Sequence, residues 1–127
     1  MADHKSAAEL VATLFLARDM THRAHLAVEG PGSFAKHEAL GSFYGAVVGL
    51  ADAFAETYQG RFDVLLDIPL LAEPHGDDIM AKLESQREWI RKARYEAMPK
   101  DETPLQNIVD EIEALYSSTR YKLMRLK

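Results

Sequence analysis

Apolar residues recur every three to four positions in four stretches of the chain, which is the spacing of helices that bury one face. No stretch alternates apolar and polar residues for long enough to indicate a sheet. The four stripes run through Leu14, Arg18, Thr21, His25 and Val28; through Leu40, Tyr44, Val47, Ala51, Phe54 and Tyr58; through Ile79, Leu83, Ile90 and Ala97; and through Leu105, Ile108, Ile112, Leu115 and Thr119. The pattern predicts an all-α protein with four amphipathic helices.

Capping and helix-breaking residues set the expected ends of the first two helices. Ser6-Ala-Ala-Glu9 is a capping-box pattern, so the first helix is expected from there to about Val28. A Gly-Pro-Gly turn follows, and both residue types break helices. The second helix is expected to take Ser33 as its N-cap and to run to about Tyr58.

The other two helices are separated by a proline. The third is expected from about Asp77 to Met98, just before that proline. The fourth opens with Thr103-Pro-Leu-Gln106, which combines an N-cap threonine, a proline at the first helical position and a glutamine at the third. This helix is expected to continue nearly to the end of the chain.

A long connection, residues 60–75, joins the second and third helices. It includes the apolar run 62–69, which could be a strand but has no partner strand, so we expect a short helix or turn there. Helices of ~20–25 residues are roughly 30–38 Å long, and sixteen extended residues reach roughly 50 Å. The connection could therefore cross the whole bundle. The three connections between the helices are thus short, long and short, which is the order in a ferritin-like four-helix bundle with one crossover. A simple up-down bundle is the alternative.

Composition narrows the class of protein. The 127 residues fit a single domain, 1–127, and 47% apolar with 28% charged residues is typical of a globular protein. The absence of cysteine excludes disulfides, thiolate metal sites and a cysteine nucleophile. The first residues lack the apolar segment of a signal peptide, and no apolar run approaches the ~18 residues that span a bilayer. We therefore expect a cytoplasmic protein without a membrane partner.

Charge argues against nucleic acid as a partner. The net charge is −5, whereas phosphate binding needs clustered Lys and Arg. The last turns are basic through Arg120, Lys122, Arg125 and Lys127, which we interpret as a complement to the helix dipole rather than as a nucleic-acid tail. Hydrolase motifs such as a phosphate-binding glycine loop or a Gly-x-Ser-x-Gly elbow are not found in the sequence.

Three of the five histidines lie between positions 22 and 37. His22 and His25 are three residues apart on the first helix, and the short turn brings His25 toward His37. Neutral imidazoles are good ligands for iron, zinc or copper, so these residues are candidate metal ligands. The alternative is a structural pair of partly buried histidines, hydrogen-bonded to the main chain or to Tyr44.

Asp52 and Glu56 form a like-charged pair four residues apart on the second helix. Their repulsion costs a few tenths of a kcal/mol, which a cation would remove; the alternative is a solvated acidic face. Asp52 lies fifteen residues after His37, or ~22 Å along a helix, so one chain cannot bring both pairs to one ion. A two-fold mate whose second helix runs antiparallel would bring histidines and carboxylates together.

A row of glycines also points to a partner. Gly41, Gly45 and Gly49 repeat every four residues on the side of the second helix that carries the two acids. Each glycine costs up to ~1 kcal/mol relative to alanine. A row of small residues lets another helix approach closely, which favours a homo-oligomer or a protein partner, whereas weak selection on an exposed face is the alternative.

The stretch His25-Leu-Ala-Val-Glu-Gly-Pro-Gly-Ser-Phe-Ala-Lys-His37-Glu-Ala-Leu resembles the signature of the Dps proteins, the DNA-protecting mini-ferritins of starved bacteria. That pattern is a His, a glycine-containing turn, a Phe and a second His followed by Glu, with Asp and Glu four apart further along. Asp52 and Glu56 match the last two places. The chain is also similar to small ferritin-like proteins of bacteriophages.

The resemblance implies a metal site shared across a dimer. His25 and His37 would come from one subunit, and Asp52 and Glu56 from its two-fold mate. In the Dps family this site binds iron and oxidises it, typically with peroxide.

One ligand position departs from the family. Dps proteins usually carry an aspartate where this chain has Gly41, and either His22 or Asp19, within two turns of His25, could replace that donor. Two functions follow. The first is a Dps-like protein that binds iron or another divalent metal across a dimer, with ferroxidase activity. The alternative, favoured by Gly41, is a ferritin-like bundle that has lost the metal site and serves as an oligomeric protein-binding or structural module.

Overall fold

Four helices make up most of the computed structural model, which describes residues 4–73 and 78–127. They are α1 (Lys5–Ala27), α2 (Ser33–Phe62), α3 (Ile79–Ala97) and α4 (Thr103–Arg125). These described residues contain no strand, so the all-α prediction is confirmed. Among them, no helix has both the length and the apolar character that crossing a membrane requires.

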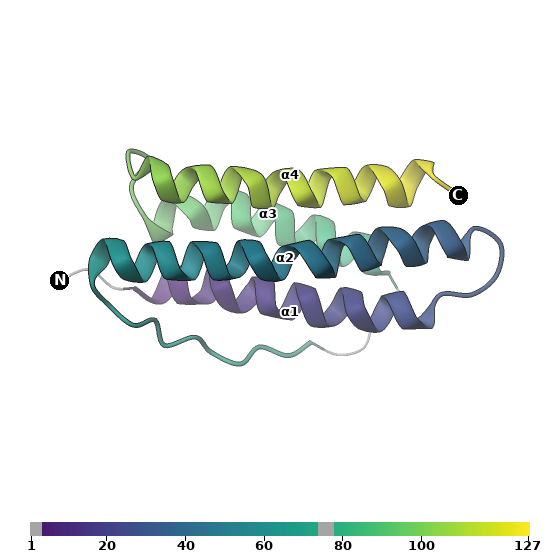
Figure 1. Cartoon of the computed structure of the whole chain (residues 1–127), viewed down its shortest axis with the longest axis horizontal. Coiled ribbons are helices and arrows are strands. Elements are labelled where there is room, and N and C mark those ends of the chain that lie inside the picture. The colour runs from purple at the N-terminus through teal and green to yellow at the C-terminus, as the bar shows by residue number, and fades with distance from the viewer. Residues whose placement is uncertain (1–3, 74–77) are drawn as a thin grey trace.

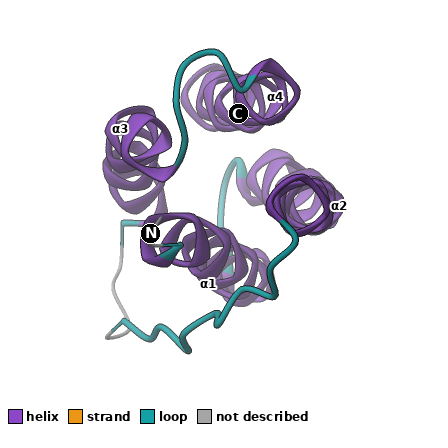
Figure 2. Cartoon of the chain, turned by 90° about the vertical axis from the view of Figure 1, so that its left-hand side faces the viewer, coloured by secondary structure: helices purple, strands orange, loops and turns teal. Residues whose placement is uncertain are grey.

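The helices form a bundle with one helix at each corner. α1 packs against α2 and α3, and α4 packs against the same two helices. Seen end-on, α1 therefore lies diagonally opposite α4 (Figure 2). α1 and α4 run in one direction and α2 and α3 in the other (Figure 1). The predicted four-helix bundle is confirmed.

The core consists of one face of each helix. On α1 the buried face is rotated away from the apolar stripe that the sequence predicted. Arg18 and Phe15, which the spacing placed on or beside that stripe, are exposed. Burying an unpaired guanidinium costs several kcal/mol, so α1 turns this edge to solvent. The core-facing residues of α1 and α2 are Leu10, Leu14, Ala17, Thr21, Leu40, Phe43, Val47, Ala51, Phe54 and Tyr58.

The starts of α1 and α2 differ from the predicted caps. α1 begins one residue before Ser6, and the N-cap of α2 is Gly32, so neither Ser6 nor Ser33 caps its helix. Gly32 has a φ of 79°, a left-handed conformation that glycine adopts without strain. At the start of α1, His4 Nδ1 lies 2.7 Å from the hydroxyl oxygen of Tyr58, which ties this helix end to α2.

The described part of the connection between α2 and α3 is extended, so the short helix or turn expected in the run 62–69 is limited to a turn at Asp63. Asp63 ends α2 in the left-handed region, and residues 64–73 have no regular structure. They run beside α1 on the outside of the bundle (Figure 1). Alternate side chains pack against the core, as an extended chain allows; these are Val64, Leu66 and Ile68. The Leu66 N–H donates to Gln59 Oε1 at 2.9 Å.

A buried arginine joins α3 to α4. Arg94 is 6% exposed, and its guanidinium donates to Gln106 Oε1, Gln106 O, Asp110 Oδ1 and Glu113 Oε2, each at 2.7 Å. Burial alone would lower the pKa of Arg94, but the hydrogen bonds that its guanidinium donates to Asp110 and Glu113 outweigh this effect and raise that pKa above its ordinary value. Arg94 therefore stays charged and holds the two helices together.

Gln106, in the first turns of α4, makes a second set of contacts between α4 and the end of α3. Its Nε2 lies 3.2–3.3 Å from the main-chain oxygens of Arg94, Met98 and Pro99 at the end of α3. α4 does have its proline in the first turn, but its N-cap is Glu102 and Thr103 makes no cap bond. The predicted Thr103–Gln106 capping box is thus wrong, because Gln106 binds the last carbonyls of α3 instead. The predicted start of α3 near Asp77 lies outside the described residues, and Asp78 caps it by accepting the Ala81 N–H.

A layer of four side chains, one from each helix, crosses the centre of the bundle. Phe43 packs edge-on against Tyr116 at a ring distance of 5.0 Å. The Tyr116 hydroxyl donates to Gln86 Oε1 at 3.0 Å, and Gln86 Nε2 contacts Met20 Sδ at 3.5 Å. Burial raises the pKa of Tyr116 above its ordinary value. The side chains of this layer are neutral, whereas bundles with internal metal sites carry inward-facing carboxylates and histidines.

Replacing Arg94 by Met should destabilise the fold by roughly 2–4 kcal/mol, because four charge-assisted bonds are lost while the hydrocarbon volume remains. Arg91→Met is the matched control on the same helix, since Arg91 is mostly exposed and reaches Glu88 only at 3.9 Å. It should change stability by less than about 0.5 kcal/mol. Urea unfolding measures both. Equal stabilities for the two variants would contradict the role given to Arg94.

Tyr116 should make the fold less stable at alkaline pH. Its folded pKa is raised, so its contribution is complete below the unfolded pKa of about 10 and is lost as pH rises beyond it, by up to about 1.4 kcal/mol per pH unit. Tyr116→Phe should lose the bond to Gln86 at every pH but decline less between about pH 9 and about pH 11. Exposed Tyr121, on the same helix, provides the control Tyr121→Phe, which should keep the wild-type decline. Parallel slopes for all three proteins would refute this expectation.

Candidate metal site at the junction of the first two helices

His25 and His37 meet across the turn between α1 and α2. His25 lies in the last turn of α1 and His37 near the start of α2. Their rings stack with centroids 3.6 Å apart and planes 21° from parallel. The structure therefore brings the two predicted histidine ligands together, as the short turn led us to expect.

Each imidazole is hydrogen-bonded to the main chain of the other residue. His25 Nδ1 lies 2.7 Å from the carbonyl oxygen of His37, and His37 Nδ1 lies 2.8 Å from the carbonyl oxygen of His25. A carbonyl oxygen only accepts, so both Nδ1 atoms carry the proton. In the neutral rings the lone pair is then on Nε2, and both Nε2 atoms have the electronic form that binds a metal.

Gly41 lies directly beneath the His25 ring. A Cβ atom at Gly41 would lie 3.0 Å from His25 Cε1 and 3.1 Å from His25 Nδ1, closer than side chains normally pack. By contrast, a Cβ atom at Gly45 or Gly49 would have nothing within 4 Å among the described residues. The three glycines that the sequence placed in one row therefore have different surroundings.

Tyr44 and His22 extend the aromatic cluster along the outside of α1 and α2. The Tyr44 ring stacks on His22 at 4.3 Å and meets the edge of His25 at 5.2 Å. The Arg18 guanidinium lies 6.0 Å from the same ring. His22 is thus engaged with Tyr44, and Asp19 is bonded to Arg23 at 2.8 Å, so the structure shows neither His22 nor Asp19 in the place of the missing donor.

Asp52 and Glu56 lie on the exposed outer face of α2, away from the histidine pair. Both side chains are exposed, and no cation among the described residues forms an ion pair with either. Within residues 4–73 and 78–127, no three His, Asp or Glu side chains are grouped closely enough to hold a metal. Within one chain the structure therefore brings together only the histidine half of the predicted site.

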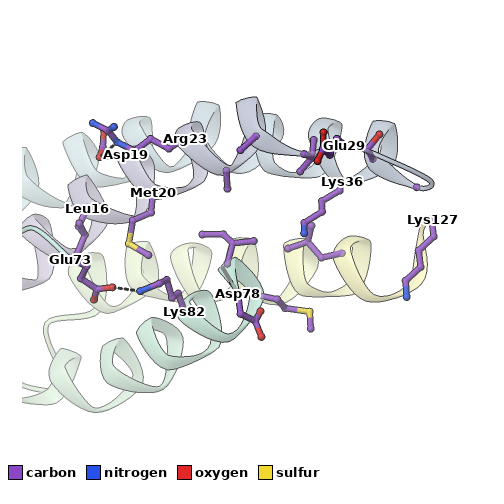
Figure 3. Close-up of a pocket in the computed structure, with 18 of the residues that line it drawn as sticks. Leu16, Asp19, Met20, Arg23, Glu29, Lys36, Glu73, Asp78, Lys82 and Lys127 are labelled. Atoms are coloured by element: carbon purple, nitrogen blue, oxygen red, sulfur yellow. Dashed lines mark hydrogen bonds and ion pairs between the residues drawn. The ribbon is translucent and has the colours of Figure 1, made fainter. Parts of the chain in front are cut away.

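A groove of about 970 Å³ lies on the other side of α1 (Figure 3). It opens at the end of the bundle where α1, α2 and α4 extend beyond the start of α3 (Figure 1). Met20, Ile79 and Leu123 contribute apolar surface, and Glu73 bonds to Lys82 at 2.9 Å at its edge. None of the four predicted ligands is among the described residues that line it. Sequence periodicity gave no sign of this groove, because it results from the relative lengths of the helices.

Residues 25–123 match a family described as "Family of unknown function (DUF5856)". The chain belongs to the DUF5856 family. The matched range begins at His25 and contains His37, Asp52 and Glu56, together with α2, α3 and most of α4. Comparison with curated proteins and with solved structures gave no match.

The two hydrogen bonds predict a difference between two substitutions of His37. His37→Ala removes the donor to the His25 carbonyl and should cost about 1 kcal/mol, after the better helix propensity of alanine is allowed for. The amide nitrogen of asparagine occupies nearly the position of Nδ1, so His37→Asn should stay within about 0.5 kcal/mol of the wild type. Chemical unfolding compares the three proteins. An asparagine variant no more stable than the alanine variant would show that the Nδ1 bond does not hold this junction.

Proposed function

We propose that this DUF5856 protein is a Dps-like, ferritin-fold protein that binds iron or another divalent metal at a site shared by two chains. His25 and His37 of one chain provide two imidazole nitrogens. Asp52 and Glu56 of a two-fold mate provide the carboxylates. Two nitrogens and two carboxylates suit Fe(II) or Zn(II). With Fe(II) as substrate and peroxide as oxidant, the proposed activity is ferroxidase turnover.

The observation that carries this proposal is the pair of Nδ1–carbonyl bonds. Metal-binding histidines almost always donate their second nitrogen to a carbonyl or carboxylate, which fixes the tautomer and the ring orientation. His25 and His37 both do so, at 2.7 and 2.8 Å. Their rings are half-buried rather than sealed in the core, so a partner chain could reach them. The donor chemistry therefore fits a divalent cation.

The outer face of α2 supports a two-fold partner. Gly45 and Gly49 lie on it with open space above their Cα atoms, and Val48 is 39% exposed between them. Asp52 and Glu56 follow on the same face. An antiparallel second α2 could approach this smooth surface closely, and it would bring each acidic end beside the histidine end of the other chain. The acids would then gain the cation that they lack in a single chain.

The direction of the helices supports the ferritin-like connectivity. α2 and α3 run the same way (Figure 1), so the chain that joins them has to return along the length of the bundle. The extended residues 64–73, which lie along α1, suit that path. We therefore include a long crossover between α2 and α3 in the proposal.

Subunit mixing tests the shared site. Two variants are made: His25→Asn with His37→Asn, which keeps the Nδ1-like donors, and Asp52→Asn with Glu56→Gln. Neither should bind Fe(II) or Zn(II) tightly alone. After random exchange, half of the dimers contain one chain of each kind and one intact site, so the mixture should recover roughly a quarter of the wild-type metal. Anaerobic titration with elemental analysis measures it.

The outcomes of the mixing experiment separate the possibilities. Recovery in the mixture supports a site formed by two chains. Metal binding by the histidine variant alone, or by the carboxylate variant alone, would refute the proposed ligand set. Oxygen or peroxide consumption with Fe(II), lost in both variants, would support ferroxidase turnover.

A second candidate function rests on the same histidines. Their bonds to the main chain can also serve as a structural clasp between α1 and α2, and the usual aspartate is absent at Gly41. The protein would then be an oligomeric protein-binding or structural bundle. A wild-type protein that forms dimers but takes up no metal in these titrations would support this candidate against the first.

A further inference from the structure

The close approach of His25 to Gly41 assigns this glycine a role of its own. A helical carbonyl faces the N–H four residues further on, so the His37 carbonyl points toward Gly41. To donate to that carbonyl, the His25 imidazole has to lie against the backbone of α2 at this turn. A Cβ atom there would be 3.0 Å from Cε1 and 3.1 Å from Nδ1.

We infer that Gly41 is a positioning residue: its missing side chain makes the space in which the His25 imidazole reaches the His37 carbonyl, and so it holds His25 in the Nδ1–H form. The His25 ring has little room to move away from a new Cβ atom. It is held by its own hydrogen bond, by the stacked His37 ring at 3.6 Å and by the edge contact with Tyr44 at 5.2 Å.

This role changes the meaning of the missing aspartate. An aspartate at position 41 would bring a carboxylate, but its Cβ atom would lie 3.0 Å from His25 Cε1 and 3.1 Å from Nδ1, so the imidazole would have to shift. In this chain a donor at position 41 therefore competes with the observed position of His25. As far as metal binding is concerned, this step rests on the proposed function; the effect on the histidine tautomers does not depend on it.

The test compares glycine substitutions on one helix. Gly41→Ala is paired with Gly60→Ala, near the other end of α2, where a Cβ atom meets nothing within 4 Å among the described residues. Alanine is the better helix former, so Gly60→Ala should raise the melting temperature by about 1–3 °C. Gly41→Ala should lower it. In a His25→Ala background the ring is gone, and Gly41→Ala should then raise the melting temperature as Gly60→Ala does.

Nitrogen-15 NMR of the imidazoles gives a readout that a merely structural role would not change. In the metal-free wild type, His25 and His37 should show the Nδ1–H tautomer at neutral pH, and Gly60→Ala should leave it unchanged. In Gly41→Ala, His25 should shift toward the signals of a solvent-exposed histidine. An unchanged His25 tautomer in Gly41→Ala, or a gain in melting temperature equal to that of Gly60→Ala, would overturn the inference.

Zn(II) titration tests whether Gly41 affects metal binding. If the wild type binds Zn(II), Gly41→Asp should bind it about 10–100-fold more weakly despite the added carboxylate, because the imidazole is displaced. Tighter binding by Gly41→Asp would overturn the inference. A wild type that binds no Zn(II) would count against the proposed function alone, since the NMR comparison still decides the role of Gly41.

Discussion

The carbonyl groups at the ends of α1 and α3 have few main-chain partners within their own helices, and both hairpins of the bundle supply side-chain donors to them in the same way. A polar side chain from the start of the following helix reaches back to them. His37 of α2 donates to the His25 carbonyl at the end of α1. Gln106 of α4 lies within bonding distance of the Arg94, Met98 and Pro99 carbonyls at the end of α3. These bonds set how each helix pair meets, and the packing between the pairs builds on that geometry.

The same constraint shows why some sequence predictions succeeded and others failed. Helix existence depends on periodicity and on breakers such as the Gly-Pro-Gly turn, which are local, and all four helices were predicted. The role of Gln106 depends on where α3 ends in space, so a local capping box was the wrong reading. Arg94 was missed for a related reason. The sequence around it is as rich in charge as the sequence around exposed Arg91, and the difference is that Arg94 packs against α4, where its hydrogen-bond acceptors lie.

Only part of the geometry of the candidate site was predictable from the sequence. Spacing placed His25 and His37 at one turn and the two acids ~22 Å away, and the structure agrees in leaving the pairs apart. What spacing could not show is that each imidazole binds the main chain beside the other. Gly41 is the clearest case. In the sequence it is a missing ligand, whereas in the structure it is the surface against which His25 lies.

The four residues of the proposed metal site all lie at or near the surface of the bundle rather than in its core. Phe43, Tyr116 and Gln86 are buried between the helices, and the buried polar residues of the described chain include no Asp, Glu or His. The carboxylates of Asp52 and Glu56 are exposed, so water competes with a cation for them. A second chain would exclude that water and complete the ligand set at once. Dimer formation and metal binding would therefore stabilise each other, and the histidine clasp that closes the first hairpin would also be the half-site that each chain offers the other.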